Sequence, residues 1–316
     1  METTTYTELG EGITCIDAQY TKSGVACFYL LEHQGECAII ETGTSHSVPY
    51  LEQLLQGKGI SVDQVRYVIP THVHLDHAGG AGLMMRRFPE AQLIVHPKGA
   101  RHLADPARLV ASAKTVYGEE TFNRQFGEVI AVDEARIRAV EDGVTLKLGE
   151  RVLAFRHTKG HADHHFCVWD ETSRGWFSGD MFGISYADMH FPDGDFVMPT
   201  TTPTQFRPEE YLKSVQLLGS YSPQGMYLTH FGRVNYTSAV SEQLSSQIIA
   251  YRELALEFGE LGDQLREELM HMTLDNLSRL NPPGGVENYR QALEMDVNLN
   301  AQGIEVWAQR VANGSL

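Results

Sequence analysis

The sequence of 316 residues lacks the features that mark membrane, disulfide-rich and exported proteins. No apolar run approaches the roughly 20 residues that cross a bilayer. The opening residues have neither the basic segment nor the apolar stretch of a signal peptide. The chain has four cysteines, which are too few for a disulfide scaffold and show no CxxC spacing: Cys15, Cys27, Cys37 and Cys167. We therefore expect a cytoplasmic protein with reduced thiols and no membrane partner.

Positive charge is also scarce. The chain has 25 Lys and Arg residues against 41 Asp and Glu residues, which gives a formal net charge of -16. The basic residues form no cluster that could follow a phosphate backbone, so no nucleic-acid partner is expected. At 42% hydrophobic and 21% charged residues, the composition suits a globular protein of one large domain or two. The abundant residue is histidine, with 14 copies that are unevenly placed.

The pattern of apolar residues divides the chain near residue 235. Before it, strand-like and helical segments alternate, and Gln34 lies in a short polar turn that predicts a hairpin. Strands are expected at 12–18, 25–32, 36–41, 65–69, 93–95, 145–148, 152–157, 166–169, 175–177 and 226–228, and helices at 47–56, 80–89 and 208–218. Residues 99–140 are expected to be mostly helical, and the proline-rich segment 181–208 to be a functional loop. Three amphipathic helices follow, up to Phe258, at 262–280 and at 286–311.

Histidines gather directly after the apolar segment 65–69, in the sequence THVHLDHAGG of residues 71–80. Two of them, His72 and His74, are two residues apart and point to the same side of an extended turn. Asp76 and His77 follow after a further turn and can face a second metal ion. Imidazole is the commonest protein ligand of borderline divalent metals, and a chance HxHxDH is on the order of one in a thousand here. The segment therefore predicts a metal site.

Three other expected strands are also followed by a small turn and a metal-type residue. They lead to His161 in TKGH, Asp180 in SGD and His230 in THFG. Sites form where strands end, because loops converge there over a rigid frame. Each of these residues alone would more often be structural, but together with HxHxDH they indicate a two-metal site.

The motifs HxHxDH, GH, SGD and THFG, in this order, resemble the metallo-β-lactamase superfamily on its glyoxalase II-like branch, over roughly residues 10–235. The resemblance implies a four-layer αββα sandwich for residues 1–235 and a helical extension for residues 236–316 that caps the active site. It also implies a ligand set. The first metal would be held by His72, His74 and His161, the second by Asp76, His77 and His230, and Asp180 would bridge them.

The resemblance assigns supporting roles as well. Glu41 stands where the family usually has Asp and is expected to support the metal-binding turn, and His165 is expected to orient a ligand. Its neighbour His164 is expected to be solvated. Four residues are candidates for the substrate pocket, and they are His102, Tyr186, His190 and Asn300. The alternative for Asn300, which falls in the apolar stripe of the last helix, is a buried amide with a backbone partner.

Departures from the family patterns narrow the expected activity. Zinc β-lactamases resemble this site but have Cys or no ligand at the position of Asp180, and flavin-partnered diiron reductases usually have Glu at that of His74. Homoserine-lactone hydrolases have Tyr three residues after the bridging Asp, where this chain has Gly183. The basic residues with which glyoxalase II holds glutathione have no counterpart here. A helical tail resembles that of the quinolone-signal thioesterase, which suggests a thioester.

The resemblance therefore implies a binuclear metallohydrolase. A hydroxide bridging two divalent ions would attack an ester-type bond, a thioester or carboxylic ester of a small molecule, with Asp76 and Asp180 as catalytic residues. Zinc is the expected metal, and iron or manganese are the alternatives. Two other functions stay open: a diiron redox enzyme and a metal-containing regulatory protein that acts through partners. A homodimer is an open possibility for the assembly.

Overall fold

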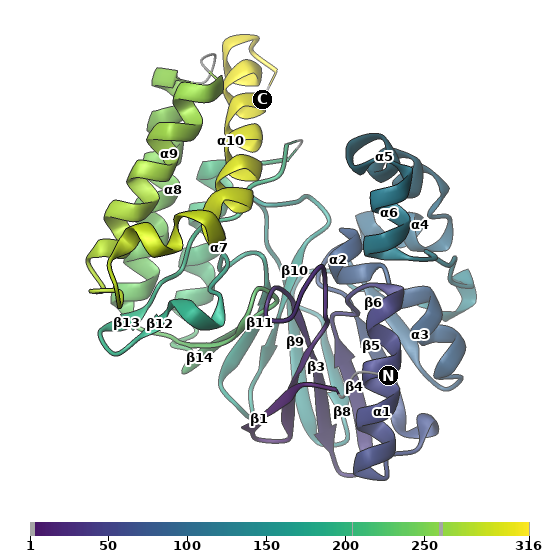
Figure 1. Cartoon of the computed structure of the whole chain (residues 1–316). Helices are drawn as coiled ribbons and strands as arrows, with labels where there is room; N and C mark the ends of the chain where they lie inside the picture. The colour runs from purple at the N-terminus through teal and green to yellow at the C-terminus, as the bar shows by residue number, and fades with distance from the viewer. Residues whose placement is uncertain (1–3, 204, 259–261, 316) are drawn as a thin grey trace. The chain divides into compact units, whose positions relative to one another are not determined.

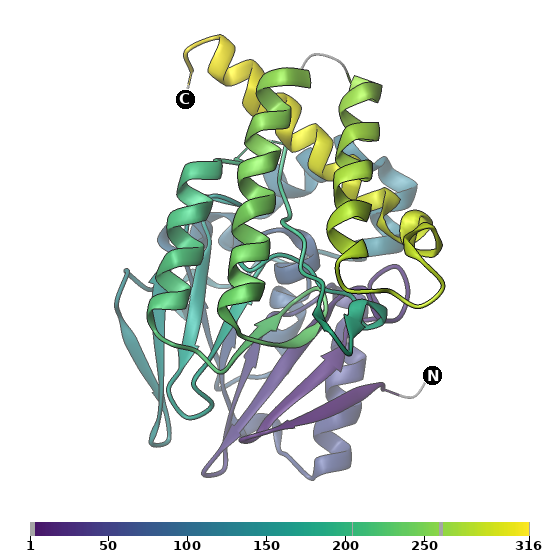
Figure 2. The same ribbon diagram turned by 90° about the vertical axis from the view of Figure 1, so that its left-hand side faces the viewer.

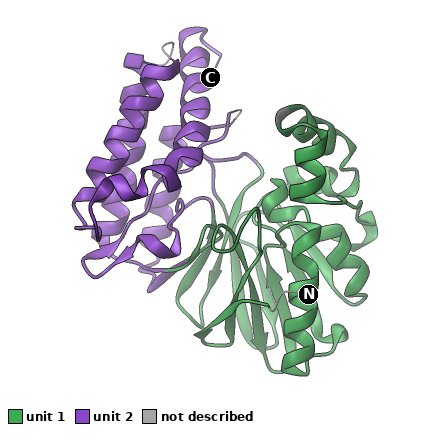
Figure 3. Cartoon of the chain, viewed as in Figure 1, with its two compact units in different colours: residues 1–157, 164–179, 227–233 green, residues 158–163, 180–226, 234–316 purple. Residues whose placement is uncertain are grey.

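The computed structural model (Figure 1, turned by 90° in Figure 2) describes residues 4–203, 205–258 and 262–315. The chain forms two compact units (Figure 3). The first unit comprises residues 1–157, 164–179 and 227–233, and the second comprises residues 158–163, 180–226 and 234–316. Because the units interleave along the chain, they do not coincide with the expected division at residue 235, which stays a prediction.

The first unit contains a seven-stranded sheet whose strands lie in chain order. They are β1 (Tyr6–Gly10), β2 (Ile13–Asp17), β3 (Cys27–His33), β4 (Glu36–Ile40), β5 (Val65–Ile69), β6 (Gln92–Val95) and β7 (Ile137–Ala139). Strands β1 to β4 pair antiparallel, and β4 to β7 pair parallel. The predicted hairpin is confirmed: Gln34 and Gly35 have φ of 50° and 79°, and a two-residue turn with two positive φ angles matches the twist of its strands.

A second sheet has six strands in the order β15-β14-β11-β10-β9-β8. They are β8 (Thr145–Leu148), β9 (Arg151–His157), β10 (Phe166–Asp170), β11 (Gly175–Gly179), β14 (Gly225–Leu228) and β15 (Gly232–Asn235). One apolar core joins the facing sides of the two sheets, with Leu31 and Ile40 from the first and Phe155 and Phe166 from the second. Alternate side chains of each strand supply this core because strand residues point to opposite faces in turn.

Helices cover the other face of the first sheet. Leu51, Met84 and Leu103 pack there, from α1 (Val48–Lys58), α3 (Ala81–Arg87) and α4 (Pro97–Ala104). The unit also contains α2 (Leu75–Ala78), α5 (Ala107–Tyr117), α6 (Glu119–Phe126), and the 3₁₀ helices η1 (Ser45–Ser47), η2 (Val62–Gln64) and η3 (Glu134–Arg136). Two facing sheets with helices outside confirm the predicted α/β sandwich. The short strands β1, β7 and β15 were not expected.

The second unit is mainly helical. It contains α7 (Pro208–Ser220), α8 (Ser238–Phe258), α9 (Gly262–Ser278), η5 (Val286–Tyr289) and α10 (Arg290–Ala312), and α8 packs against the other three long helices. The predicted helical extension is therefore confirmed. Segment 181–207 is mostly irregular, with η4 (Ala187–Met189) and the small hairpin of β12 (His190–Phe191) and β13 (Gly194–Asp195). Within the described part of the chain, no helix has the length and apolar character of a membrane span.

Candidate metal centre

The HxHxDH segment runs from the loop after β5 into α2 in the first unit. The backbone of His74 is extended, with φ of -62° and ψ of 147°, and helix α2 begins at Leu75. Gly80 then passes close to η1: a Cβ on Gly80 would lie 2.7 Å from the carbonyl oxygens of both Thr42 and Thr44. Glycine is therefore required there for the turn to approach the neighbouring loop.

The rings of the segment are packed against one another. Nε2 of His72 lies 2.7 Å from Nδ1 of His74, and the ring centroids of His72 and His77 are 4.0 Å apart. Ligand-type atoms of Glu41, His72 and His77 lie within 4.8 Å of one another, as do those of Asp76, His77 and His230. The first unit thus brings together five of the predicted ligands: His72, His74, Asp76, His77 and His230.

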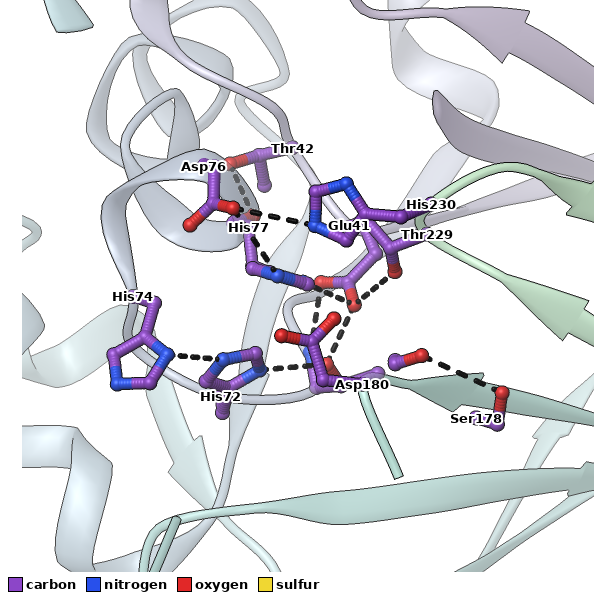
Figure 4. A network of polar contacts seen from close by, with 12 residues as sticks. Glu41, Thr42, His72, His74, Asp76, His77, Ser178, Asp180, Thr229 and His230 are labelled. Atoms are coloured by element: carbon purple, nitrogen blue, oxygen red, sulfur yellow. Dashed lines mark hydrogen bonds and ion pairs between the residues drawn. The ribbon is translucent and has the colours of Figure 1, made fainter. Parts of the chain in front are cut away.

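Asp76 is shared by two histidines (Figure 4). Its Oδ2 lies 3.3 Å from Nε2 of His230 and 3.6 Å from Nε2 of His77. On the far side of the rings, Nδ1 of His230 lies 2.8 Å from the carbonyl oxygen of Val25, and Nδ1 of His77 lies 3.0 Å from Oε1 of Glu41. These oxygens only accept hydrogen bonds, so each Nδ1 carries a hydrogen, and in a neutral ring each Nε2 then presents a lone pair to Asp76.

The donor atoms in this arrangement suit a metal ion. A lone pair and a carboxylate oxygen repel each other at these distances unless a proton or a cation lies between them. Metal-binding histidines usually donate their other ring N–H to a carbonyl or carboxylate oxygen, as His77 and His230 do. Nitrogen and oxygen donors at this spacing suit a borderline divalent ion. The donor set therefore fits the group that the resemblance implies.

Glu41 fixes three segments of the first unit. Its carboxylate accepts the Thr71 N–H at 3.0 Å, the Thr71 hydroxyl at 2.5 Å and the Thr229 hydroxyl at 3.1 Å, besides the ring of His77. Its own backbone is left-handed, with φ of 64°, a conformation that costs a non-glycine residue free energy and is concentrated at functional sites. The Glu41 side chain thus ties the HxHxDH and THFG segments together, and its expected role in support of metal binding stays a prediction.

The second unit repeats the same pairing. Nε2 of His161 lies 3.2 Å from Oδ2 of Asp180, and Nδ1 of His161 lies 3.1 Å from the carbonyl oxygen of Thr200. Both side chains are buried. The Tyr211 hydroxyl donates to the backbone carbonyl of Asp180 at 2.7 Å, which holds the residue after β11. His161 and Asp180 therefore present the same donor pair, with the same tautomer, as His230 and Asp76.

The two histidines that follow His161 are both buried against the HxHxDH segment within the first unit. The His165 ring lies 4.9 Å from that of His72, beside Gly179, where a Cβ would come within 2.7 Å of Nε2 of His165. The expectation that His164 is solvated is wrong. Its ring stacks 6.0 Å from that of His72, because the chain turns inward before β10.

Three of the predicted pocket residues make local polar contacts. The Tyr186 hydroxyl lies 3.1 and 3.0 Å from the two carboxylate oxygens of Asp296, and Nε2 of His190 lies 3.0 Å from the Ser185 hydroxyl. His102 is partly buried, and burial together with a neighbouring arginine lowers the pKa of its ring. Their pocket roles stay predictions.

Asn300 is buried at 1% exposure in the second unit. Its Oδ1 accepts the Thr201 N–H at 2.7 Å, and its Nδ2 donates to the Pro199 carbonyl at 2.9 Å. Of the two alternatives drawn from the sequence, the structure has the buried amide with backbone partners, because the loop before α7 occupies its polar atoms. A side chain so placed does not line an open pocket.

Two threonines next to predicted ligands were not predicted from the sequence to have a role. Thr71 and Thr229 both donate to Glu41, and each directly precedes a metal-type histidine. The repeated Thr-His pair was the available signal. Thr200 acts through its backbone carbonyl, which no side-chain pattern marks.

An aromatic cluster lies beside the segment that carries Asp76. Leu75, Phe122 and Phe126 form a buried group against which Tyr20 packs. The ring of Phe126 lies 5.8 Å from that of Tyr20 and 5.4 Å from that of Tyr117. Burial and the charge of Asp76 raise the pKa of Tyr20. A small buried apolar cluster thus lies beside the segment that carries Asp76.

Comparisons with known proteins agree with these observations. The family model of the metallo-beta-lactamase superfamily matches residues 24–218. Over 188 residues the chain is 30% identical to the human acyl-coenzyme A thioesterase MBLAC2 (Homo sapiens), a match that covers 55% of this chain and 64% of that protein. It is 23% identical over 251 residues to the metallo-beta-lactamase fold-containing protein ST1585 of Sulfurisphaera tokodaii, which covers 78% of this chain and 88% of that protein.

Solved structures show the same fold. The metallo-beta-lactamase family protein TTHA1429 of Thermus thermophilus matches with a TM-score of 0.66 and 20% identity, over 97% of this chain and 95% of that chain. The structure of ST1585 matches with a TM-score of 0.61 and 22% identity, over 76% of this chain and 87% of that chain. At these identities the likeness concerns the fold alone.

Proposed function

The chain belongs to the metallo-beta-lactamase superfamily, and from this premise we propose that it is a metal-dependent hydrolase of a small-molecule thioester or carboxylic ester. One observation carries the proposal. A histidine Nε2 meets a carboxylate oxygen at His230 and Asp76 and again at His161 and Asp180, with each Nδ1 bonded to a backbone carbonyl. This is the donor arrangement that a hydrolytic metal centre needs.

The proposed ligands follow the pattern of the family. His72, His74 and His161 would hold one ion, Asp76, His77 and His230 a second, and Asp180 both. Zinc suits nitrogen and oxygen donors of this kind, and iron or manganese are the alternatives. Bound divalent ions would lower the pKa of a water molecule toward neutrality and so supply hydroxide at pH 7.

The chain's own residues would perform the other tasks. The carboxylate of Asp76 is 23% exposed and can accept a proton from the nucleophile and return it to the leaving group. Glu41 and the Val25 carbonyl hold the rings of His77 and His230 with Nε2 toward Asp76.

The aromatic cluster supports a substrate with an apolar acyl group. Phe126 belongs to the buried cluster with Leu75, the residue before Asp76, and its ring packs against that of Tyr117, which is 41% exposed and so accessible to a substrate. The human relative carries the name of an acyl-coenzyme A thioesterase, and the chain spans 64% of that relative's length. Burying part of an acyl chain against aromatic rings stabilises binding by about 0.8 kcal/mol for each methylene group. A thioester with an acyl chain is therefore the substrate class we place first.

A hydrolysis panel on protein of known metal content tests the proposal. The panel contains acyl-CoA and glutathione thioesters, lactones, phosphodiesters and β-lactams. We expect turnover of a thioester or carboxylic ester that disappears on metal removal and returns with zinc. Asp76→Asn should abolish this turnover with an unchanged circular dichroism spectrum, and Asp63→Asn, in the exposed η2, is the matched control.

The other two function classes give different outcomes. If the purified protein contains iron, consumes oxygen and hydrolyses no ester, it is a diiron redox enzyme and not a hydrolase. A cellular phenotype that survives the double change of Asp180 and His230 to Ala would favour a regulatory protein that acts through partners. Removal of residues 236–316 tests the capping role: unchanged activity and selectivity on small esters would contradict it.

A further inference from the structure

The loop before α7 holds His161 at two points within the second unit. The Thr200 carbonyl accepts the Nδ1–H of the His161 ring at 3.1 Å. The Thr202 hydroxyl donates to the backbone carbonyl of His161 at 2.8 Å. Both the ring and the backbone of His161 are therefore positioned by residues 200–202, so the direction of its Nε2 depends on where this loop lies.

The loop is in turn held by one side chain of the C-terminal extension. The amide of Asn300, on α10, accepts from the Thr201 N–H at 2.7 Å and donates to the Pro199 carbonyl at 2.9 Å. It thereby fixes the residues on both sides of Thr200. The Thr201 hydroxyl also donates to the Asn300 carbonyl at 3.1 Å.

Helix α8 also forms hydrogen bonds with Asn300 and with the segment before this loop. The Tyr251 hydroxyl lies 3.2 Å from Nδ2 of Asn300, and the Gln247 amide donates to the Val197 carbonyl at 2.7 Å. Gln247 and Asn300 are each 1% exposed, and Tyr251 is fully buried. Water therefore cannot replace a lost partner, and an unpaired group here would bear the full cost of its desolvation.

Close backbone contact keeps α10 against the loop. A Cβ on Gly303 would collide with the Thr201 hydroxyl and would lie 3.0 Å from the Thr202 carbonyl oxygen. The glycine lets the helix approach this closely, one turn after Asn300. The position of the loop is thus set jointly by the amide and by the fit of the helix surface.

We propose that Asn300 is a positioning residue for metal binding: through the backbone of residues 199–201 it sets the ring of His161 for coordination. The C-terminal helices would then determine metal affinity, in addition to any effect on substrate. The inference rests on the proposed function only in taking His161 as a ligand. Groups that orient a ligand through its second nitrogen typically change metal affinity by about 10–100-fold when they are removed.

The test measures zinc binding to the metal-free full-length chain by competition with a chromophoric chelator. We expect Asn300→Ala to weaken one zinc equivalent by about 10–100-fold. The absorption spectrum of the cobalt-loaded protein should change with it, since coordination geometry sets that spectrum. Asn298→Ala, on the same helix and partly exposed, is the matched control and should bind zinc like the unchanged protein.

A second variant covers a loss of folding. Asn300→Ser keeps a small uncharged side chain that can still form one hydrogen bond with the loop, so it should give a smaller loss of affinity in the same direction. If Asn300→Ala or Asn300→Ser is folded by circular dichroism and has unchanged zinc affinity and cobalt spectrum, the inference is overturned. Because neither readout uses an ester, a failed hydrolysis panel would reject the proposed function without rejecting this inference.

Discussion

Nδ1 of His77 lies 3.0 Å from Oε1 of Glu41, with the two side chains 0% and 1% exposed. The contact fixes the ring in a place that water does not reach. The same carboxylate receives two hydrogen bonds from Thr71 and one from Thr229, so the end of β4, the HxHxDH segment and the THFG segment are joined at one point. We therefore expect substitutions of Glu41 to change metal affinity.

We expect Glu41→Gln to lower zinc affinity by about 10–100-fold, because an amide cannot accept from all four donors and its NH₂ group would face at least one of them. Equilibrium dialysis with elemental analysis measures the effect. Glu41→Asp keeps the charge but shortens the reach, and its affinity should lie between those of Glu41→Gln and the unchanged protein. Equal zinc affinity of Glu41→Gln and the unchanged protein would show that the carboxylate does not support the site.

Metal removal should destabilise the chain. Without a cation, Nε2 of His230 and Nε2 of His161 face carboxylate oxygens at 3.3 and 3.2 Å. An ion present at about 1,000 times its dissociation constant stabilises the folded state by about 4 kcal/mol, so EDTA should lower Tm by roughly 10 °C. Differential scanning calorimetry checks this, with zinc-saturated EDTA as control. A metal-free protein with unchanged Tm would contradict the argument.

The aromatic cluster gives a prediction on acyl selectivity. Tyr117 is 41% exposed, and its ring lies 5.4 Å from that of Phe126. Tyr117→Ser should raise KM for a long-chain acyl thioester about tenfold, since it removes roughly 1.4 kcal/mol of apolar contact, and leave an acetyl thioester unaffected. Tyr6→Ser, 49% exposed on β1, is the control. Equal losses on both substrates would place the acyl chain elsewhere.

Breaking a buried ion pair should strongly destabilise the second sheet. Arg151 and Asp170 are both fully buried, and their bidentate contacts measure 2.8 and 2.6 Å. Asp170→Asn leaves an uncompensated buried charge, which typically costs about 3–5 kcal/mol of unfolding free energy. Urea unfolding followed by tryptophan fluorescence measures it. A loss below about 1 kcal/mol would mean that the guanidinium finds other partners.

The partly exposed ion pair between Arg156 on β9 and Asp142 should contribute less to the free energy of unfolding than the Arg151–Asp170 pair. Its contribution should also depend on pH. Burial disfavours the charged form of Asp142, but hydrogen bonds from Arg156 and the His157 N–H outweigh it and hold the pKa below the usual 3.8. A lowered pKa gives stability that is present above the usual value and is lost as the pH falls through the lowered one. Asp142→Asn should therefore cost roughly 0.5 kcal/mol at pH 7 and nothing in strong acid. Thermal unfolding at both pH values tests this.

The sequence alone predicted the strands that carry the metal-type residues. Apolar segments ended by a small turn mark β5, β9, β11 and β14 without reference to tertiary contacts. Strands β1 and β7 escaped prediction because their side chains are mostly exposed and show no alternation. For such edge strands, pairing depends on the neighbour and not on their own pattern.

The sequence predicted the parts of the candidate site that are side chains able to bind a metal ion. The burial of His164 was missed, because it depends on how the chain turns before β10. The stripe position of Asn300 predicted burial but left its partner open, since that partner is backbone from a segment without periodicity. Carbonyl groups such as that of Thr200 leave no mark in a sequence, so their role appears only in three dimensions.

The position of Asn300 in α10, the last helix of the described chain, has a consequence for biosynthesis. A growing chain on the ribosome carries all seven metal-type residues, from His72 to His230, well before this amide has been made. Until then the amide cannot hold the Thr201 segment, and His161 lacks the orientation that this segment provides. The proposed role of Asn300 therefore implies that His161 reaches its final orientation only after α10 has been synthesised and has packed against this loop.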